Sequence, residues 1–316
     1  MENKLNNQKV TIIAGPCSVN ENNIDQLFSI ANISVVDANN NQKKAIWGLR
    51  VVGLKSRTSM DSTGEGMGMD FHEYMHNVEM ATSNQLVDNF KIYPSTEIAR
   101  RLVEETGLVV ATEIMDPIIQ LPVFEKIIPK GKLLIWNPAV NQLGYQMYIM
   151  GIYANRNGWF IGVKNGKWFG EISDGGVNIM EKNWIGQPSF ATKDGQFPLR
   201  NRIAMIHRGV DIENKGKFRN LPVHESAQKV KKRTGVKMFF DPSHSLGRFL
   251  RDKIVEQTIL AMHMKTEKDE YLYDGILIEV GTSKTDTDQH ITIEELQILC
   301  NEISKFRDLN NNEQEI

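Results

Sequence analysis

Side chains able to bind metals or anions follow eight short apolar segments of this sequence. In chain order they are Cys17, then Lys55, Arg57 and Thr58, then Glu113, Asn137, Lys164, His207 and Arg208, Asp241 and His244, and Glu279. A cysteine, a histidine, a glutamate and a nearby aspartate make a mixed ligand set that suits Mn, Fe, Co or Zn rather than calcium. Taken singly, Cys17 is more typical of a small buried hydrophobe and His244 of a hydrogen-bonded loop histidine. Their shared position after apolar segments favours a divalent metal site.

Basic side chains form a second group at the same positions. Arg50 lies inside an apolar run, where a charged side chain is costly unless it meets an anion. The others, which lie at or just beyond the ends of such runs, are Lys55, Arg57, Lys164 and Arg208. The whole chain has 37 basic and 39 acidic residues and a net charge of -2, so this concentration of positive charge is local. We expect a small polyanionic substrate with more than one phosphate or carboxylate.

Eight apolar segments alternate with helical patterns along the 316-residue chain. The predicted strands cover residues 10–14, 47–54, 108–111, 133–136, 160–163, 203–206, 236–240 and 275–280. Apolar residues spaced three and four apart predict amphipathic helices, among them residues 94–105, 225–233, 253–264 and 293–306. Eight strands alternating with helices predict a (β/α)8 barrel, an α/β fold whose active site lies at the carboxyl ends of the strands.

The barrel is predicted to form a single catalytic domain over residues 10–309. Residues 165–202 make too long a segment for a plain connection after the fifth strand, and they are expected to hold a helix plus a hairpin or loop. The polar segments 1–9 and 310–316 are predicted to be flexible tails.

Composition narrows the class of protein. The near-zero net charge argues against a nucleic-acid partner, and no apolar run approaches the ~18 residues of a membrane span. The two cysteines, Cys17 and Cys300, lie at opposite ends of the chain, and no apolar leader precedes Lys9, so a cytoplasmic protein without disulfides is expected. Cys300 falls in the apolar pattern of the last helix, which predicts core packing.

Taken in order, the motifs around these residues resemble those of the class I 3-deoxy-heptulosonate phosphate (DAHP) synthase family, which includes the related 3-deoxy-octulosonate phosphate (KDO8P) synthases. The motifs are IAGPCS at 13–18, Arg50 with KSRTS at 55–59, VKNG at 163–166, HRG at 207–209, DPSH at 241–244, IEV at 278–280 and TDTDQ at 285–289. They extend from the first strand to the eighth, over nearly the whole chain. This family condenses phosphoenolpyruvate with an aldose phosphate, and the resemblance implies a homodimer or homotetramer.

The resemblance also implies a role for each matching residue. The metal would be held by Cys17, His244, Glu279 and an aspartate, for which Asp286 is the better match and Asp288 its rival. Phosphoenolpyruvate would be bound by Arg50, Lys55, Lys164 and Arg208, and the aldose phosphate by Arg57 and Thr58. Lys55 is the family's candidate proton donor to the aldehyde oxygen. Glu113 could supply the carboxylate near the positive charge that develops at C2.

Three features of the sequence bear on the metal and the aldose. Cys17 favours a metal-dependent member, because metal-free octulosonate synthases have Asn there, and the K-x-R-T-S segment favours erythrose 4-phosphate. Asn137-Pro138-Ala139 stands where heptulosonate synthases have G-A-R, and it is closer to the octulosonate pattern. The expected reaction is the condensation that opens the shikimate pathway to aromatic amino acids. The alternatives are an octulosonate synthase that uses arabinose 5-phosphate and a non-catalytic barrel that binds a sugar phosphate.

Overall fold

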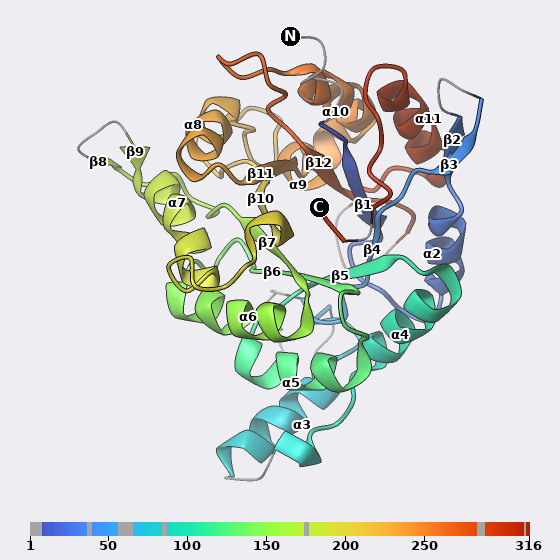
Figure 1. Ribbon diagram of the computed structural model, residues 1–316, viewed down its shortest axis with the longest axis vertical. Coiled ribbons are helices and arrows are strands. Elements are labelled where there is room, and N and C mark those ends of the chain that lie inside the picture. The colour runs from blue at the N-terminus through green and yellow to red at the C-terminus, as the bar shows by residue number, and fades with distance from the viewer. Residues whose placement is uncertain are drawn as a thin grey trace.

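Eight parallel strands form a closed barrel at the centre of the computed structural model (Figure 1). The structure describes residues 8–36, 40–55, 66–83, 87–173, 177–282, 288–312 and 314–316. In their order around the barrel, the strands are β1 (Thr11–Gly15), β12 (Gly275–Glu279), β11 (Lys237–Phe240), β10 (Ile203–His207), β7 (Phe160–Lys164), β6 (Leu133–Trp136), β5 (Val109–Glu113) and β4 (Gly48–Arg50). The pairing of β4 with β1 closes the barrel.

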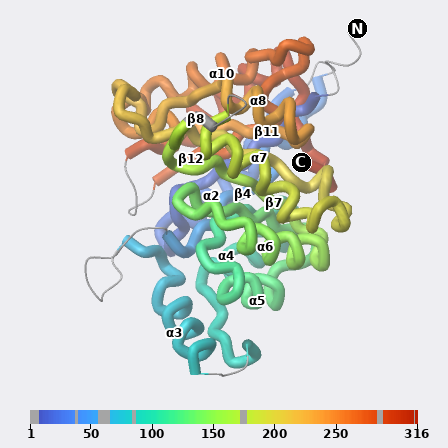
Figure 2. Tube along the Cα trace, turned by 90° about the vertical axis from the view of Figure 1, so that its left-hand side faces the viewer, coloured from blue at the N-terminus to red at the C-terminus, as the bar shows by residue number. Residues whose placement is uncertain are grey.

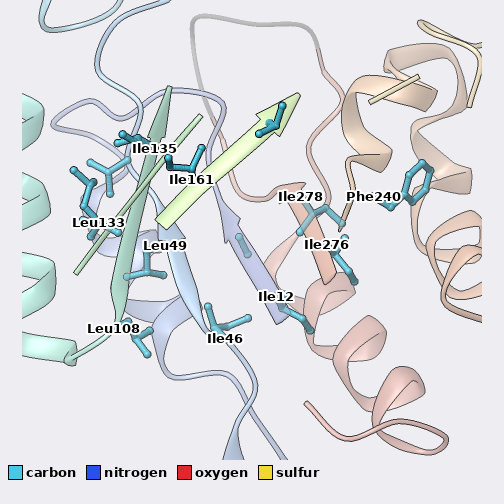
Figure 3. Close-up of a cluster of buried hydrophobic side chains, with 14 of the residues drawn as sticks. Ile12, Ile46, Leu49, Leu108, Leu133, Ile135, Ile161, Phe240, Ile276 and Ile278 are labelled. Atoms are coloured by element: carbon cyan, nitrogen blue, oxygen red, sulfur yellow. The ribbon is translucent and has the colours of Figure 1, made fainter. Parts of the chain in front are cut away.

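The strands are apolar along most of their length because both of their faces are buried. Successive residues point to opposite sides, so that Ile12 belongs to the layer between barrel and helices and Ile13 to the layer inside the barrel. Figure 3 shows part of the outer layer, where Ile12 and Leu49 lie on the neighbouring strands β1 and β4. The inner layer includes Trp47 and Phe160, whose rings meet edge to face with their centroids 5.0 Å apart.

Helices surround the barrel (Figure 1). They are α2 (Ile24–Ala31), α3 (Phe71–Thr82), α4 (Pro94–Thr106), α5 (Pro117–Ile127), α6 (Gly144–Asn157), α7 (Ile179–Ala191), α8 (His224–Thr234), α9 (Pro242–Leu246), α10 (Ile254–His263) and α11 (Ile293–Ser304), with short 3-10 turns at Val87–Asn89, Arg200–Arg202 and Arg248–Lys253. Helix α3 extends away from the barrel, at the lower end of Figure 2. In the part of the chain that the structure describes, no helix is both long and apolar enough to cross a membrane.

The predicted barrel is confirmed, and each of its eight predicted strands coincides with an observed one. The largest difference is in the second strand, predicted over 47–54 and observed as Gly48–Arg50, because Val51, Val52 and Leu54 are buried although they lie beyond the last ladder pair. The segment 165–202 holds the hairpin β8 (Ile172–Ser173) and β9 (Val177–Asn178) followed by α7. A further hairpin pairs β2 (Ser34–Val36) with β3 (Gln42–Lys44). The sequence does not predict it, because its second strand is an exposed run of Gln and Lys without an apolar pattern.

Residues that follow α11 lie across the amino-terminal end of the barrel. The backbone N–H of Val10 donates to Asp308, and the backbone N–H of Asn310 donates back to Val10, each at 2.8 Å. The indole N–H of Trp47 donates to the carbonyl oxygen of Asn312 at 2.9 Å. Ile316 is fully buried in the inner layer of the barrel. The segment that the sequence predicts to be a tail therefore covers this end of the barrel.

Candidate active site

The carboxyl ends of the strands carry most of the residues that the sequence singles out. Arg50, Glu113, Lys164 and Glu279 are the last residues of β4, β5, β7 and β12. Those that follow a strand end are Cys17, Lys55, Arg208 and Asp241, with His244 on the short helix α9. Arg57, Thr58 and Asp286 lie outside the described residues. The structure brings the other predicted site residues to one end of the barrel.

Cys17 and Lys55 are in direct contact at this end. Lys55 Nζ donates to Cys17 Sγ at 2.8 Å and to the carbonyl oxygen of Cys17 at 3.2 Å. Gly15 lets the chain pass close to β4, because its φ of 153° favours glycine and a Cβ there would lie 2.9 Å from the carbonyl oxygen of Arg50. Burial would lower the pKa of Lys55, but Cys17 and Glu113 raise it above its ordinary value, so Lys55 is held as an ammonium.

Arg50 carries a buried guanidinium at the end of β4. Its Nη2 donates to Glu279 Oε1 at 3.1 Å, and both side chains are almost fully buried. Burial would lower the pKa of Arg50, but the neighbouring acids, Glu279 first, raise it above its ordinary value. Nε and Nη1 of Arg50 are buried and have no hydrogen-bond partner among the described residues. Since a buried charged donor without a partner is costly, these two groups point to an anionic ligand.

Lys164 lies beside Arg50 over the same aromatic ring. Lys164 Nζ is 5.3 Å, and Arg50 Cζ 5.6 Å, from the ring centroid of Trp136. Lys164 Nζ is also 3.4 Å from Asp241 Oδ2. Burial lowers the pKa of Lys164 below its ordinary value, although the carboxylates of Asp241 and Glu113 raise it. Two cations are thus held close together, which favours the binding of an anion between or beside them.

Three asparagines fix the cations at the ends of β7 and β10. Asn137 Oδ1 accepts from the backbone N–H of Lys164 at 2.9 Å, and Asn165 Oδ1 accepts from the backbone N–H of Arg208 at 2.8 Å. Asn220 Oδ1 accepts from Arg208 Nη1 at 3.1 Å. Burial lowers the pKa of Arg208 to about 10, so it stays charged at neutral pH. The VKNG motif contains Asn165, but nothing in the sequence singles out Asn220.

His244 is held by Asp241 through one ring nitrogen and faces Glu279 with the other. Nδ1 lies 2.9 Å from Asp241 Oδ2, and Nε2 lies 3.6 Å from Glu279 Oε1. Burial would raise the pKa of Asp241, but His244 and Lys164 hold it below its ordinary value, so Asp241 is a carboxylate. A carboxylate at Nδ1 keeps the proton on that nitrogen and leaves the lone pair of Nε2 available to a metal.

Glu279 and Cys17 also form hydrogen bonds with Gln289 and His290, which lie between β12 and α11. Gln289 Nε2 donates to Glu279 Oε2, and Gln289 Oε1 accepts from Arg219 Nη1. His290 Nε2 accepts from the backbone N–H of Cys17 at 2.9 Å. Nothing in the sequence singles out Arg219 or His290, although His290 directly follows the TDTDQ motif. These contacts fix the carboxylate and the backbone of the cysteine that the motifs assign to metal binding.

The chemical types of the possible ligands at this end of the barrel suit a divalent metal such as Mn, Fe, Co or Zn. An imidazole with a free lone pair on Nε2, a carboxylate and a cysteine lie at the same end of the barrel. Within the described ranges, no three His, Cys, Asp or Glu side chains are placed so that they could hold a metal ion. Asp286 lies outside those ranges, and Asp288 is exposed. The metal ligands therefore stay a prediction.

The site opens onto a cavity of about 400 Å³. Its lining is Lys55, Glu113, Ala139, Val140, Lys164, Lys167, Arg208, Asp211, Lys215, Arg219, Asn220 and His244. A larger cavity, of about 820 Å³, lies at the amino ends of β1, β11 and β12, where Lys231 is paired with Asp274 at 2.7 Å. The smaller cavity is lined by five of the residues that the sequence predicts for the site, Lys55, Glu113, Lys164, Arg208 and His244, and the larger cavity by none of the predicted site residues. The smaller cavity is therefore the candidate active site.

The fold resembles that of solved DAHP synthases. A DAHP synthase (phospho-2-dehydro-3-deoxyheptonate aldolase) from Thermotoga maritima has a TM-score of 0.66 and 19% sequence identity, over 96% of this chain and 72% of that chain. A truncated 3-deoxy-D-arabino-heptulosonate 7-phosphate synthase from the same organism has a TM-score of 0.65 and 19% identity, over 97% and 91% of the two chains. No family model and no curated protein matches the sequence. The comparison confirms a DAHP synthase-like barrel fold, which is what the motifs predict.

Proposed function

We propose that this chain is a metal-dependent transferase that condenses phosphoenolpyruvate with erythrose 4-phosphate. The products would be 3-deoxy-D-arabino-heptulosonate 7-phosphate and phosphate, as in the first step of the shikimate pathway. The observation that carries the proposal is the pair of buried donors on Arg50, Nε and Nη1, that lack a partner among the described residues. A ligand with several anionic oxygens would satisfy them. The motifs and the DAHP synthase-like fold support phosphoenolpyruvate as that ligand.

The residues have separate tasks in this reaction. Arg50, Lys164 and Arg208 bind the phosphate and carboxylate of phosphoenolpyruvate and place its C3 against the aldehyde carbon. C3 attacks that carbon, and Lys55, held as an ammonium, gives a proton to the aldehyde oxygen. Water then adds at C2, and phosphate leaves with its bridging oxygen. Glu113, at the end of β5, stabilises the positive charge that develops at C2.

A divalent metal would be held by Cys17, His244, Glu279 and Asp286. When bound, it would polarise the aldehyde carbonyl as a Lewis acid. Asp241 serves this site indirectly, because its carboxylate keeps the Nδ1 proton on His244 and leaves Nε2 free to bind.

The test is the release of inorganic phosphate from phosphoenolpyruvate by the purified full chain. Erythrose 4-phosphate and arabinose 5-phosphate are offered separately, each with manganese or with a chelator. We expect release with erythrose 4-phosphate and manganese only. Release that persists in chelator would contradict the metal requirement.

Two outcomes of the same assay favour the alternatives. Release with arabinose 5-phosphate alone would make the chain an octulosonate synthase, which the Asn137-Pro138-Ala139 segment favours. Binding of phosphoenolpyruvate without release in the presence of either sugar would indicate a non-catalytic sugar-phosphate-binding barrel.

A further inference from the structure

The ring of Trp136 adjoins two of the cations that are proposed to bind phosphoenolpyruvate. Trp136 is the last residue of β6, and its side chain is fully buried in the inner layer of the barrel. The ring centroid lies 5.6 Å from Cζ of Arg50 and 5.3 Å from Nζ of Lys164, and both of these residues are almost fully buried as well. The three side chains are therefore removed from water, which strengthens the attraction between a cation and the face of an aromatic ring.

Each of the two cations is also in contact with a carboxylate. Arg50 Nη2 donates to Glu279 Oε1 at 3.1 Å, and Lys164 Nζ lies 3.4 Å from Asp241 Oδ2. Glu279 ends β12 and Asp241 follows β11, so these contacts hold the two cations from different strands. The cations themselves repel each other, because they carry the same charge. The negative face of the indole ring attracts both of them and offsets part of this repulsion.

The indole N–H of Trp136 is buried and has no hydrogen-bond partner among the described residues. Burying this donor without a partner costs free energy that a phenylalanine at the same position would not. Compared with phenylalanine, tryptophan has a larger ring that binds cations more strongly. The tryptophan at the end of β6 is therefore better explained by the two cations beside its ring than by packing alone.

We propose that Trp136 is a positioning residue, whose ring keeps Arg50 and Lys164 side by side in the arrangement that binds phosphoenolpyruvate. The proposal rests on the proposed function, because phosphoenolpyruvate is a substrate of that reaction. When the cations are already together in the free chain, the ligand does not have to bring them together, and it binds more tightly. This matters in a chain that has Asn137-Pro138-Ala139 where heptulosonate synthases have an arginine, because the remaining cations must then bind the anion without it.

The first test is a calorimetric titration of phosphoenolpyruvate into the full chain without an aldose. The variants are Trp136→Phe, which keeps an aromatic ring, and Trp136→Leu, which removes it. The matched controls are Trp47→Phe and Trp47→Leu, because Trp47 is also fully buried in the inner layer but donates to Asn312 at the other end of the barrel. We expect the affinity to fall about tenfold or more in Trp136→Leu, to fall less in Trp136→Phe, and to stay unchanged in both Trp47 variants.

A second test leaves the size of the side chain almost unchanged, so that it applies even if Trp136→Leu does not fold. Fluorinated tryptophans are introduced at Trp136 alone by codon suppression, and each added fluorine makes the face of the ring less negative. The affinity for phosphoenolpyruvate should fall stepwise with the number of fluorine atoms. A merely structural role would leave the affinity of the folded chain unchanged. Equal affinities across the series would overturn the proposal, and so would equal losses in Trp136→Leu and Trp47→Leu.

Failure of the proposed function is read separately, in the phosphate-release assay. A stepwise loss of affinity in the fluorinated series, together with no turnover by the wild type, would keep the role of Trp136 and reject the condensation. Turnover by the wild type with equal affinities across the series would keep the condensation and reject the role of Trp136. A wild-type chain that does not bind phosphoenolpyruvate would reject both.

Discussion

Lys55 is the residue on which the proposed chemistry depends most directly. A general acid must carry its proton before the reaction and must reach the atom that receives it. The environment of Lys55 meets the first requirement, because Cys17 and Glu113 hold its pKa above the ordinary value in spite of burial. Its position in the cavity lining, with Lys164 and Arg208, meets the second.

Lys55→Met should therefore lower kcat for phosphate release by roughly 10²- to 10⁴-fold, the range that general acid catalysis contributes. Methionine has a similar length but carries no proton to transfer. The matched control is Lys237→Met, an exposed lysine at the start of β11, which should leave kcat unchanged. An unchanged kcat in Lys55→Met would remove the residue from the proposed mechanism.

Arg50→Lys tests whether Nε and Nη1 of Arg50, which have no partner among the described residues, bind an anion. Lysine keeps the charge but cannot present the planar fork of donors, so the affinity for phosphoenolpyruvate should fall about tenfold or more. The measurement is a calorimetric titration of phosphoenolpyruvate without an aldose. Arg101→Lys is the control, because Arg101 makes an exposed ion pair with Glu105 at 2.6 Å, outside the site. Equal affinities in the two variants would contradict the assignment of Arg50.

At the scale of elements, the chain after β4 is clamped by the starts of α3 and α4. The backbone N–H of Asp70 donates to the carbonyl oxygen of Gly53 at 3.0 Å, and that of Lys55 donates to Met67 at 2.7 Å. The carboxylate of Asp70 accepts from the backbone N–H of Ser95 at 2.9 Å and from Ser95 Oγ. Gly53 is required, because a Cβ there would overlap the Asp70 carboxylate. The clamp sets where Lys55 enters the cavity.

Burial raises the pKa of Asp70 from 3.8 to about 6. A carboxyl group with a raised pKa in the folded state contributes stability that is full below its unfolded pKa and is lost as pH rises through the folded pKa. Relative to Asp70→Asn, which cannot ionise, the wild type should therefore lose up to about 3 kcal/mol of unfolding free energy between about pH 4 and pH 7. Urea unfolding of both proteins across this range measures the difference. Parallel pH profiles would mean that Asp70 is not the titrating group.

Two histidines and a tyrosine link β10, α8 and the segment before β12. Tyr273 Oη lies 2.7 Å from His207 Nδ1 and 2.6 Å from His224 Nδ1. Because the hydroxyl has one proton, it donates to one ring and accepts from the other. Burial lowers the pKa of His224 to about 4 and that of His207 well below 6.5. Both rings are therefore neutral in the folded protein at neutral pH.

His224→Gln should reduce the loss of stability in acid. A histidine with a lowered pKa in the folded state stabilises the fold above its unfolded pKa, and this contribution is lost as pH falls through the folded pKa. Relative to His224→Gln, the wild type should lose up to about 3 kcal/mol of unfolding free energy from about pH 6.5 to pH 4. Asp70 acts in the opposite direction over the same range, so each variant must be compared with the wild type. Identical acid profiles for His224→Gln and wild type would refute this role.

At the scale of the whole molecule, the barrel could be predicted because each strand is a short apolar run buried on both faces. The site could be predicted where a reactive side chain ends or directly follows such a run, as Glu113 and Lys164 do. Arg219 and His290 could not be predicted as site residues. They lie in long connections, and the spacing of residues in the sequence does not show that these connections come back to the site. The position of Asn137 at a strand end singles it out in the sequence. Its hydrogen bond with the backbone N–H of Lys164 is seen only in the structure.

The candidate site residues lie at one end of the barrel, and at the other end the apolar side chain of Ile316 fills part of the inner layer. Ile316→Ala should lower the free energy of unfolding by about 2–5 kcal/mol, because it empties part of a packed interior. Ile298→Ala, on α11 with 53% of the residue exposed, should change it by no more than about 0.5 kcal/mol. Urea unfolding compares them, and equal effects would mean that Ile316 contributes no more than a surface side chain. At temperatures where the variant is still folded, phosphate release should be unchanged, because Ile316 lies at the end of the barrel away from the candidate active site.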